Sequence, residues 1–294
     1  MNESITPLIT VIIPTYNHAN FLKRALQSVC DQTYINWEII IIDNYSTDKT
    51  DSIIRSFTDK RIKSLKINNN GLIAASRNMG IRAAKGEWIA FLDSDDWWSS
   101  NKLETCLSYM VADIDFIYHN LDVTYDKPSF FKKRTSCSKV GTPVLKSLLC
   151  MGNPIANSGV VVRKELLVQV GGISEEVDMV AAEDYNTWLK ISAITDAFKY
   201  IPTSLGGCLI HDGGMSQRDM SIPHRYAVDA FKSVLTNDEL KYLDKDIFYI
   251  SGRHKYLNRE FFDARVDLMQ SLSFKKLYQS LKAIYMTITI IFSR

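Results

Sequence analysis

Three long apolar runs in the first hundred residues each end in polar residues, and helical patterns follow the first two. Residues 10–14 and 37–42 are apolar at nearly every position, end at Thr15 and Asp43, and precede apolar residues at helical spacing. Residues 88–92 form the third run, which ends at Asp93. Runs that do not alternate with polar residues are typical of parallel strands covered on both faces by helices. The pattern therefore predicts an α/β fold with a mostly parallel central sheet flanked by helices.

The polar residues directly after these runs form the first candidate site. Ligands of open α/β sheets bind beyond the carboxyl ends of the strands. Residues 14–16, Asp43 and residues 93–96 all follow predicted strand ends. We therefore expect three loops that are distant in the sequence to meet at one crevice.

Residues 93–96 read Asp-Ser-Asp-Asp and place three carboxylates at the end of one strand. Like charges at this spacing raise each other's pKa, so a site that keeps all three ionised needs a positive partner. Oxygen ligands favour Mg²⁺ or Mn²⁺ over zinc. A solvated acidic turn before a helix that begins near Ser99 is the other interpretation, and this pattern alone leaves both open.

Ordered motifs give a more specific indication. They read V-I-I-P-T-Y-N at 11–17, D-N-x-S-T-D-x-T at 43–50 and R-N-x-G-I-x-x-A-x-G-E-W-I-x-F-L-D-S-D-D at 77–96. This set resembles the nucleotide-binding half of family 2 glycosyltransferases with the GT-A fold, and residues 157–163, 170–173 and 182–190 are similar to the acceptor-side motifs of that family. The resemblance implies a catalytic domain over 1–220, with a nucleotide-sugar half at about 1–115 and an acceptor half at about 116–220.

The resemblance also implies roles for the residues that match. The nucleotide-sugar site would contain Pro14, Thr15, Tyr16, Asp43, Arg77, Asp93 and Ser94. Asp95 would bind Mn²⁺ or Mg²⁺ directly, His211 would lie near the metal or the diphosphate, and Asp96 would orient its neighbours. Asn44 stands where the family often has a second acid, which removes one charge and keeps an acceptor. A surface charge is the other interpretation of Arg77, and a structural histidine that of His211.

Glycosyl transfer requires a base, because the attacking hydroxyl must lose its proton. In the family that the chain resembles, the aspartate equivalent to Asp184 is this base, with Glu183 supporting it, and the reaction inverts the anomeric configuration. An acidic first turn favoured by the helix dipole is the alternative interpretation of this pair. Trp97, Trp98 and Trp188 are candidates for contact with the acceptor sugar, and ordinary core packing is their alternative.

Composition is consistent with a single large catalytic domain with additions. The chain has 294 residues, 46% apolar residues and a formal net charge of +2, which argues against nucleic acid as the main partner. Its five cysteines have no metal-binding spacing and are expected to be free thiols in a reducing compartment. The first residues have no signal-peptide pattern, and no apolar stretch has the length of a membrane span. We therefore expect a cytoplasmic enzyme.

Two segments indicate contact with a membrane surface. Residues 127–146 are basic and contain aromatic residues, and the helical region 221–294 ends in a segment that is apolar on one face and flanked by Lys275, Lys276, Lys282 and Arg294. An interfacial helix on the cytoplasmic face of the inner membrane has this pattern. A terminal helix docked on the catalytic domain has it too, and the basic segment is equally consistent with an ordinary surface loop.

The sequence thus predicts a metal-dependent, inverting glycosyltransferase that takes its sugar from a nucleotide-sugar, with a UDP-sugar favoured. The expected acceptor is a glycan or a polyprenyl-diphosphate-linked sugar of surface polysaccharide synthesis, such as O-antigen or capsule. A sugar nucleotidyltransferase is the enzyme alternative, although residues 13–20 lack the glycines of a phosphate loop. A non-catalytic subunit that binds nucleotide-sugars is the other alternative.

Overall fold

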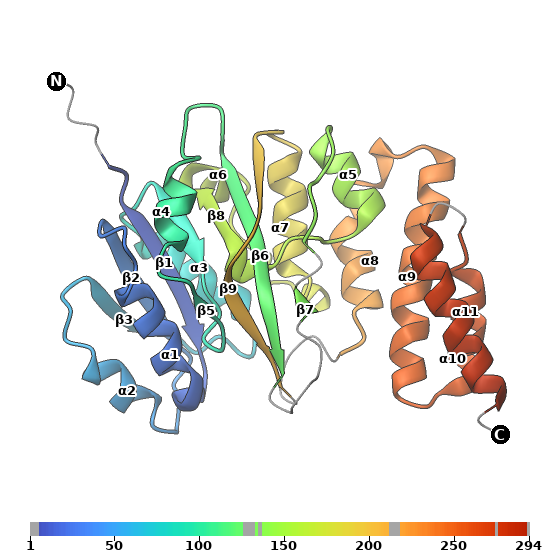
Figure 1. Cartoon of the computed structure of the whole chain (residues 1–294), viewed down its shortest axis with the longest axis horizontal. Coiled ribbons are helices and arrows are strands. Elements are labelled where there is room, and N and C mark those ends of the chain that lie inside the picture. The colour runs from blue at the N-terminus through green and yellow to red at the C-terminus, as the bar shows by residue number, and fades with distance from the viewer. Residues whose placement is uncertain (1–5, 126–132, 135–136, 212–217, 274–275, 293–294) are drawn as a thin grey trace.

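The computed structural model describes residues 6–125, 133–134, 137–211, 218–273 and 276–292. Among these residues, nine strands form one central sheet with the order β3-β2-β1-β4-β8-β6-β9-β5, and β7 pairs with β6 (Figure 1). Helices flank the sheet, and three helices stand at its far end in the C-terminal region. The α/β class predicted from the sequence is confirmed.

The first four strands of the chain are parallel to one another. They are β1 (Ile9–Thr15), β2 (Trp37–Asp43), β3 (Ile62–Lys66) and β4 (Trp88–Phe91). Every residue of β1, β2 and β4 is buried, as the non-alternating apolar runs predicted. Because the side chains of a strand alternate between its faces, these strands supply both hydrophobic cores of the domain.

The sheet is mixed beyond β4. Strand β4 pairs antiparallel with β8, β8 antiparallel with β6, β6 parallel with β9, and β9 antiparallel with the short β5. The strands of this half are β8 (Val160–Arg163), β6 (Phe116–Tyr125), β9 (Phe198–Ile210), β5 (Trp97–Trp98) and β7 (Lys133–Arg134). The mostly parallel arrangement predicted from the sequence therefore holds for the nucleotide half.

Helices cover the two faces of the sheet and define its two cores. On one face, β1 and β2 pack with α1 (Ala19–Cys30), α2 (Thr50–Ser56) and α4 (Lys102–Leu107). The other core involves α3 (Ile73–Ala83), α5 (Val144–Met151), α6 (Lys164–Gln169), α7 (Glu183–Ser192) and α8 (Ser221–Asp229). Short 3₁₀ helices in the described part of the chain lie at Asn157–Gly159, Val177–Met179 and Lys232–Val234.

Close packing of α3 on β1 depends on Gly80. A Cβ atom at this position would lie 2.6 Å from the Ile12 side chain, closer than two carbon atoms can approach. The missing side chain lets the helix approach the strand closely. This contact fixes the position of Arg77 relative to β1, because Arg77 lies one turn before Gly80 on α3.

Three C-terminal helices form a smaller layer at one end of the molecule (Figure 1). They are α9 (Asn237–Leu257), α10 (Phe261–Gln270) and α11 (Leu277–Phe292), and α9 begins at a capping box formed by Thr236 and Glu239. Their own core consists of Ala264, Leu268, Ala283, Met286 and Ile290. Helix α11 is therefore docked on α9 and α10, whereas the sequence left open a terminal helix docked on the catalytic domain or on a membrane.

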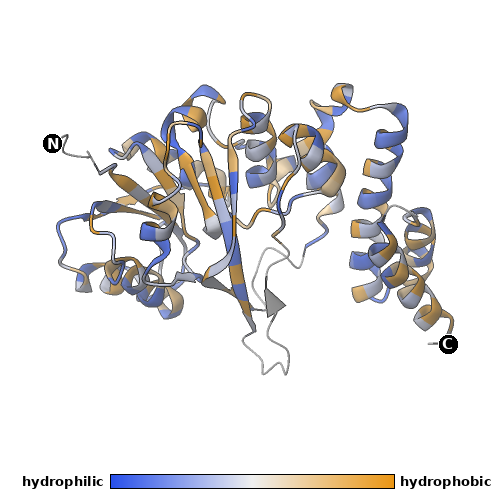
Figure 2. Ribbon diagram, turned by 45° about the horizontal axis from the view of Figure 1, so that its top comes forward, coloured by the Kyte–Doolittle hydropathy of each residue, from blue (hydrophilic) through white to orange (hydrophobic). Residues whose placement is uncertain are grey.

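The outer faces of α10 and α11 are also rich in apolar residues. Figure 2 shows hydrophobic and hydrophilic residues mixed along these helices. Among the described residues, no helix has both the length and the apolar character that crossing a membrane requires. The aromatic residues of the basic segment, Phe130 and Phe131, lie outside the described residues. The division of the chain at residues 115 and 220 stays a prediction.

Candidate active site

The ends of β1, β2 and β4 bring the sequence-predicted residues to one edge of the sheet. Thr15 is the register partner of Asp43, and β4 pairs with β1 through Ile12 and Phe91. Asp93 follows two residues after Phe91. Since all three strands are parallel, their carboxyl ends lie at the same edge. The three loops therefore converge as the apolar pattern predicted, while the roles of their side chains stay predictions.

Two buried acceptor atoms lie where β1 and β2 end. Asp43 is fully buried, and its Oδ1 accepts hydrogen bonds from the backbone N–H and the hydroxyl of Ser46 at 3.0 and 2.6 Å. Asp43 Oδ2 and Thr15 Oγ1 are buried without a hydrogen-bond partner, although Lys66 Nζ lies 3.8 Å from Asp43 Oδ2. Buried polar atoms without partners are costly, so a ligand that donates hydrogen bonds here would be stabilised.

The other residues predicted to bind the nucleotide base differ in exposure. Pro14 lies inside β1 and is buried, whereas Tyr16 is 53% exposed at the rim. The side chain of Asn44 accepts a hydrogen bond from the backbone N–H of Asn69 at 3.0 Å. The amide at position 44 thus serves the loop before α3.

Asn17 ties the loop after β1 to the loop after β2. Its Oδ1 accepts hydrogen bonds from the backbone N–H groups of Thr47 and Asp48 at 2.7 and 3.3 Å. Asp48 Oδ2 in turn accepts from the backbone N–H of Ala19 at 3.0 Å. Asn17 has a positive φ of 52°, a conformation that asparagine tolerates better than most residues. These bonds fix both loops at the predicted site for the nucleotide base.

The acidic segment 93–96 is held by contacts from several elements. Asp93 Oδ1 accepts hydrogen bonds from Arg77 at 2.8 Å and from Asn157 at 3.1 Å, and its backbone N–H donates to Ser158 Oγ at 3.0 Å. Asp96 is buried and accepts from the backbone N–H of Leu209 at 3.2 Å. Burial and the carboxylates of Asp93 and Asp95 raise the pKa of Asp96 well above its usual range. A cation beside the segment would offset this repulsion.

Asp95 lies against His211, which comes from the end of β9. Asp95 Oδ2 and His211 Nε2 are 3.0 Å apart, so the structure brings together the two residues predicted to be nearest to the metal. No group of three or more His, Cys, Asp or Glu side chains in the described part of the chain is arranged to hold a metal by itself. One carboxylate and one imidazole fit Mn²⁺, whose other ligands would be diphosphate oxygens and water.

Arg77 links the acidic segment to α7. Its Nη1 lies 2.7 Å from Glu183 Oε1 and its Nη2 lies 2.8 Å from Asp93 Oδ1. The guanidinium is almost completely buried, and although burial alone lowers its pKa, the carboxylates of Asp93 and Glu183 raise that pKa above the usual value. Arg77 is therefore no surface charge, and it remains cationic while it joins the two halves of the site.

Asp184 lies in the first turn of α7, next to this ion pair. Its Oδ1 accepts a hydrogen bond from the backbone N–H of Tyr185 at 2.6 Å, and Asn153 Nδ2 lies 3.5 Å from its Oδ2. Burial, followed by the charge of Glu183, raises the pKa of Asp184 to about 7. A carboxylate with this pKa is basic enough to accept a proton at neutral pH.

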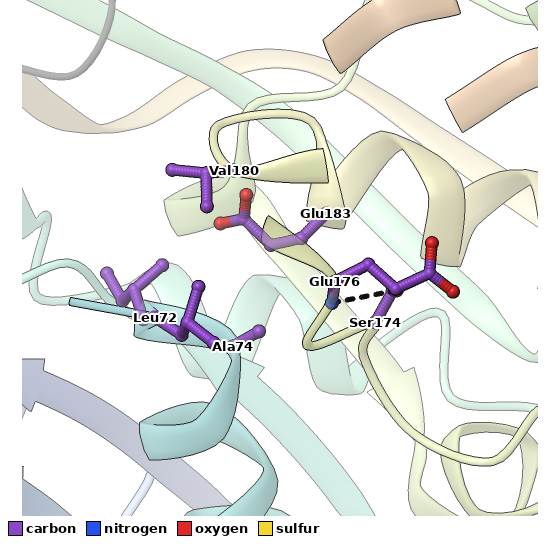
Figure 3. A pocket seen from close by; sticks show the side chains of 7 residues that line it. Leu72, Ala74, Ser174, Glu176, Val180 and Glu183 are labelled. Carbon is purple, nitrogen blue, oxygen red and sulfur yellow. Dashed lines mark hydrogen bonds between the residues drawn. The ribbon is translucent and has the colours of Figure 1, made fainter. Parts of the chain in front are cut away.

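A small cavity of about 10 Å³, roughly the room for one water molecule, lies beside Glu183 (Figure 3). Leu72 and Ala74 line it from the start of α3, and Val180 lines it from the segment before α7. Ser174, Glu176 and Glu183 supply the polar part of its lining. Glu183 Oε2 is buried and has no hydrogen-bond partner, so only its Oε1 is engaged, by Arg77.

Two of the three tryptophans predicted at the acceptor side require a correction. Trp188 is fully buried, and its ring packs 6.1 Å from that of Phe91 and 4.8 Å from that of Phe116. Trp98 is also buried, and its Nε1 donates a hydrogen bond to the carbonyl of Ser158 at 2.7 Å. Both are core residues, the alternative that the sequence left open, because strand and helix register turn them inward.

Trp97 is only partly buried, and its ring has two close neighbours. The guanidinium carbon of Arg24 lies 3.8 Å from the ring centroid. A Cβ atom at Gly207 would lie 2.2 Å from the ring, so the indole packs directly on the backbone of β9. Trp97 therefore contributes to the packing of β5, and its contact with an acceptor sugar stays a prediction.

Sequence reasoning assigned no role to several residues that contact the acidic segment. Asn157 and Ser158 were recognised only as part of a motif, while His18 directly follows the V-I-I-P-T-Y-N motif and Arg24 lies in the next helix, α1. His18 Nδ1 lies 2.7 Å from Ser94 Oγ, and Arg24 donates to the carbonyl of Asp95 at 2.6 Å. The polar residues just after a strand-end motif were the only available signal, because the contacts span more than 60 positions of sequence.

Comparison with known proteins places the chain among glycosyltransferases. The family model described as Glycosyl transferase family 2 matches residues 10–163. The UDP-Glc:alpha-D-GlcNAc-diphosphoundecaprenol beta-1,3-glucosyltransferase WfgD of Escherichia coli is 33% identical over 185 residues, which are 63% of this chain and 69% of that protein. The putative teichuronic acid biosynthesis glycosyltransferase TuaG of Bacillus subtilis is 40% identical over 107 residues, 36% of this chain and 42% of that protein.

Solved structures show the same fold. The S. aureus TarS 1-349 structure in complex with UDP-GlcNAc has a TM-score of 0.64 at 19% identity and covers 96% of this chain and 81% of that chain. The mannosyltransferase PcManGT from Pyrobaculum calidifontis, in complex with GDP-Man and Mn²⁺, has a TM-score of 0.63 at 19% identity, with 97% and 81% covered. The likeness extends over nearly the whole chain, including the C-terminal helices, and shows the GT-A fold.

Proposed function

The chain belongs to glycosyltransferase family 2, and from this premise we propose that it is a metal-dependent, inverting enzyme that transfers the sugar of a UDP-sugar to a lipid-linked glycan. The observation that carries the proposal is the double contact of Arg77 with Asp93 and Glu183. This contact sets the acidic segment at the nucleotide edge of the sheet beside the helix that begins with Glu183 and Asp184. The proposed binding site for the sugar donor is thus adjacent to the proposed catalytic base.

Asp184 is the proposed base. In its ionised form it accepts the proton of the acceptor hydroxyl, whose oxygen then forms a bond to the anomeric carbon of the donor. The bond from that carbon to the diphosphate oxygen breaks, and the nucleoside diphosphate leaves with the electron pair. Attack from the face opposite the leaving group inverts the anomeric configuration. The raised pKa of Asp184 supports this role, since a base poised near the working pH is effective.

Residues at the ends of β1 and β2 are proposed to hold the nucleotide. Pro14 and Thr15 form the floor, Tyr16 the rim, and Asp43 the acceptor for a donor group of the base or ribose. Asp43 Oδ2 and Thr15 Oγ1 support this assignment, because both are buried without a hydrogen-bond partner. Ser94 and Asp93 follow along the same edge toward the sugar.

Asp95 and His211 are the residues that would hold a divalent ion, with Mn²⁺ or Mg²⁺ as candidates. Such an ion supplies charge to neutralise the departing diphosphate. The contact between Asp95 and His211 supports the proposal, as does the PcManGT structure, which is a complex with GDP-Man and Mn²⁺. Arg77 is paired with Asp93 and Glu183, and its proposed role is to position Asp93 at the site of the sugar donor.

The acceptor is proposed to be a polyprenyl-diphosphate-linked sugar of surface polysaccharide synthesis, such as O-antigen or capsule. The names of two relatives support this class. Both WfgD and WfaP of Escherichia coli are named as glucosyltransferases that act on alpha-D-GlcNAc-diphosphoundecaprenol. WfaP is 39% identical over 120 residues, which are 48% of its own length. The chain spans about half or less of several of its relatives, so substrate identity rests on the experiment below.

A lipid-linked acceptor requires access to a membrane surface, and the outer face of α10 and α11 is proposed to supply it. We define this outer face by its exposed apolar residues: Phe262, Val266 and Met269 on α10, and Leu277, Tyr278, Leu281, Ile284, Tyr285, Ile288 and Ile291 on α11. Their spacing of three, four and seven residues places them in stripes along each helix. The inner residues of the same helices form the small core described above.

Charge favours an anionic lipid surface as the occupant of this outer face. Helix α11 contains no acidic residue, and its Lys282 is exposed with its Nζ over the ring of Tyr278 at 4.2 Å. Tyrosines one heptad apart, Tyr278 and Tyr285, suit the headgroup region, and an exposed lysine beside an apolar stripe suits anionic headgroups. The enzyme would then lie on the cytoplasmic face of the inner membrane, where nucleotide-sugars are available.

The proposal is tested with the purified protein and a panel of nucleotide-sugars. Release of the nucleoside diphosphate is measured with and without Mn²⁺ and with an undecaprenyl-diphosphate-linked GlcNAc acceptor or a short-chain analogue. Transfer from one UDP-sugar, dependent on both the metal and the acceptor, is expected. The coupling constant of the new anomeric proton, read by NMR, should show a configuration opposite to that of the donor.

The same experiment separates the competing functions. A sugar nucleotidyltransferase would release pyrophosphate from a nucleoside triphosphate and a sugar phosphate. A binding subunit would hold UDP-sugars without releasing UDP. Either result, or retention of configuration in the product, would overturn the proposal.

A further inference from the structure

His18 occupies a position between the predicted nucleotide site and the predicted metal residues. It precedes α1 directly and follows Asn17, whose side chain is bound to the loop after β2. The path of the chain is thus fixed up to His18 by the same turn, 15–17, that forms the nucleotide wall. Any shift of this turn on nucleotide binding would move His18.

The His18 side chain contacts the middle of the acidic segment. His18 Nδ1 and Ser94 Oγ share a hydrogen bond of 2.7 Å, and Ser94 is buried. Ser94 lies between Asp93 and Asp95, so its side chain determines how the two carboxylates are presented. Among the hydrogen bonds described for this segment, this one connects Ser94 to the turn after β1.

The ring of His18 also supports His211 from one side. Its centroid is 6.0 Å from that of His211, and the two planes are nearly perpendicular at 77°. Phe21, one turn into α1, packs against both rings, at 5.6 Å from His18 and 5.2 Å from His211. Such edge and tilted contacts between rings are favourable. The imidazole that contacts Asp95 is therefore oriented by residues of the same turn.

A third contact comes from the next turn of α1, where Arg24 donates to the carbonyl of Asp95 at 2.6 Å. The start of α1 thus touches the acidic segment at Ser94, at Asp95 and, through His211, at the Asp95 carboxylate. Because a helix moves as a rigid element, a displacement at residues 15–17 reaches all three points together. This arrangement is a physical connection between nucleotide and metal positions.

We propose that His18 is a positioning residue that couples nucleotide binding to divalent-metal binding, through its hydrogen bond to Ser94 and its packing on His211. The inference deepens the proposed function and rests on it, since it takes a nucleoside diphosphate and a divalent cation as the ligands. Its consequence is reciprocal: the metal strengthens nucleotide binding by the same factor by which the nucleotide strengthens metal binding.

The test measures this factor by calorimetry, as the ratio of UDP affinities with and without Mn²⁺. His18→Leu removes the hydrogen bond at similar volume, whereas His18→Asn keeps a hydrogen-bonding atom near the position of Nδ1. We expect the ratio to fall at least about fivefold in His18→Leu and to stay near the wild-type value in His18→Asn. His254→Leu on α9, which removes an exposed bond to Asn258, is the matched histidine control and should leave the ratio unchanged.

Ser94→Ala removes the same hydrogen bond from its other end. It is the alternative test if His18→Leu does not fold. It should lower the ratio, and the double variant should lower it no further than either single change, because the two residues act through one contact. An unchanged ratio in both single variants, or equal loss of UDP affinity with and without Mn²⁺, overturns the role of His18. A wild-type protein whose UDP affinity does not respond to Mn²⁺ contradicts the proposed function itself and removes the coupling with it.

Discussion

Arg77 and Glu183 form a buried ion pair, with Nη1 and Oε1 2.7 Å apart, between residues that are 106 positions apart in the chain. The second arm of the same guanidinium holds Asp93 at 2.8 Å. One cation therefore stands between two carboxylates, with Asp184 beside it, and it lowers the pKa of Asp184 against the effects of burial and of Glu183. Stability and reactivity of the site depend on the same side chain.

Replacing Arg77 should destabilise the protein strongly. Arg77→Met leaves the buried Glu183 and the half-buried Asp93 without their cation, and breaking a buried pair such as Arg77 with Glu183 costs about 3–5 kcal/mol. Glu183→Gln alone removes one charge and keeps a polar group. We expect the double variant to lose less free energy of unfolding than the sum of the single losses, measured by denaturant unfolding. Additive losses would show that the pair does not act as a unit.

Asp95→Ala should abolish the Mn²⁺-dependent part of UDP binding, because it removes the carboxylate nearest to the proposed metal and leaves the diphosphate charge uncompensated. Calorimetry with UDP in the presence and absence of Mn²⁺ measures this part. Asp238→Ala, which removes an exposed carboxylate on α9 that pairs with Lys241, is the control. Unchanged affinity in Asp95→Ala would exclude this residue as a ligand.

The nucleotide half was predictable from sequence because its strands are contiguous apolar runs. The run 37–42 corresponds to β2, Trp37–Asp43, and the run 88–92 begins at the start of β4, Trp88–Phe91. Their acidic ends then follow from the rule that ligand loops lie at carboxyl ends of parallel strands. The order of β8, β6 and β9 was not predictable, since nothing in one sequence tells which antiparallel partner a buried strand selects.

Side-chain orientation limited the rest of the site prediction. Trp97 and Trp98 were candidates for contact with the acceptor sugar, but they form β5, so Trp98 turns into the core and Trp97 lies on the backbone at Gly207. The contact of Arg77 with Glu183 joins distant segments, and no local pattern encodes it.

Asp184→Asn should retain UDP binding and lose transfer. The amide keeps the shape of the carboxylate but cannot accept a proton at neutral pH, and loss of a general base costs on the order of 10²-fold or more in rate. Transfer is measured as the initial rate with donor and acceptor in excess, and UDP binding is measured by calorimetry. A variant that turns over near the wild-type rate places the base elsewhere.

The rate of transfer should rise with pH through about 7. Asp184 acts only when ionised, and its pKa is raised to about 7, so kcat/KM is low in acid and reaches a plateau above that pH. The contribution of Asp184 to the free energy of unfolding should change with pH in the opposite direction. A carboxyl whose pKa is raised in the folded state contributes stability that is present at low pH and is lost as the pH rises through the raised pKa. A rate midpoint near the ordinary aspartate value of about 4 would contradict the buried environment described for Asp184.

The outer face of α10 and α11 can be tested without disturbing the core of the helical layer. Deleting α11 would remove Ala283, Met286 and Ile290 from that core, so loss of folding would obscure the result. Leu281→Glu with Ile288→Glu instead places two charges on exposed positions of one stripe. Ile35→Glu, at an exposed apolar residue in the loop before β2, is the matched control.

Flotation with vesicles provides the measurement. The wild type and Ile35→Glu should float with vesicles that contain phosphatidylglycerol and much less with purely phosphatidylcholine vesicles, and added salt should weaken the association because it screens the lysine contacts. The double variant should remain in the unbound fraction while its transfer to a short-chain acceptor analogue stays near the wild-type rate, since both substitutions lie far from Asp184 in the fold. Equal flotation of all three proteins would show that this face does not contact lipid. A wild-type dimer in light scattering that the double variant converts to a monomer would instead show that a second copy of the chain covers the face.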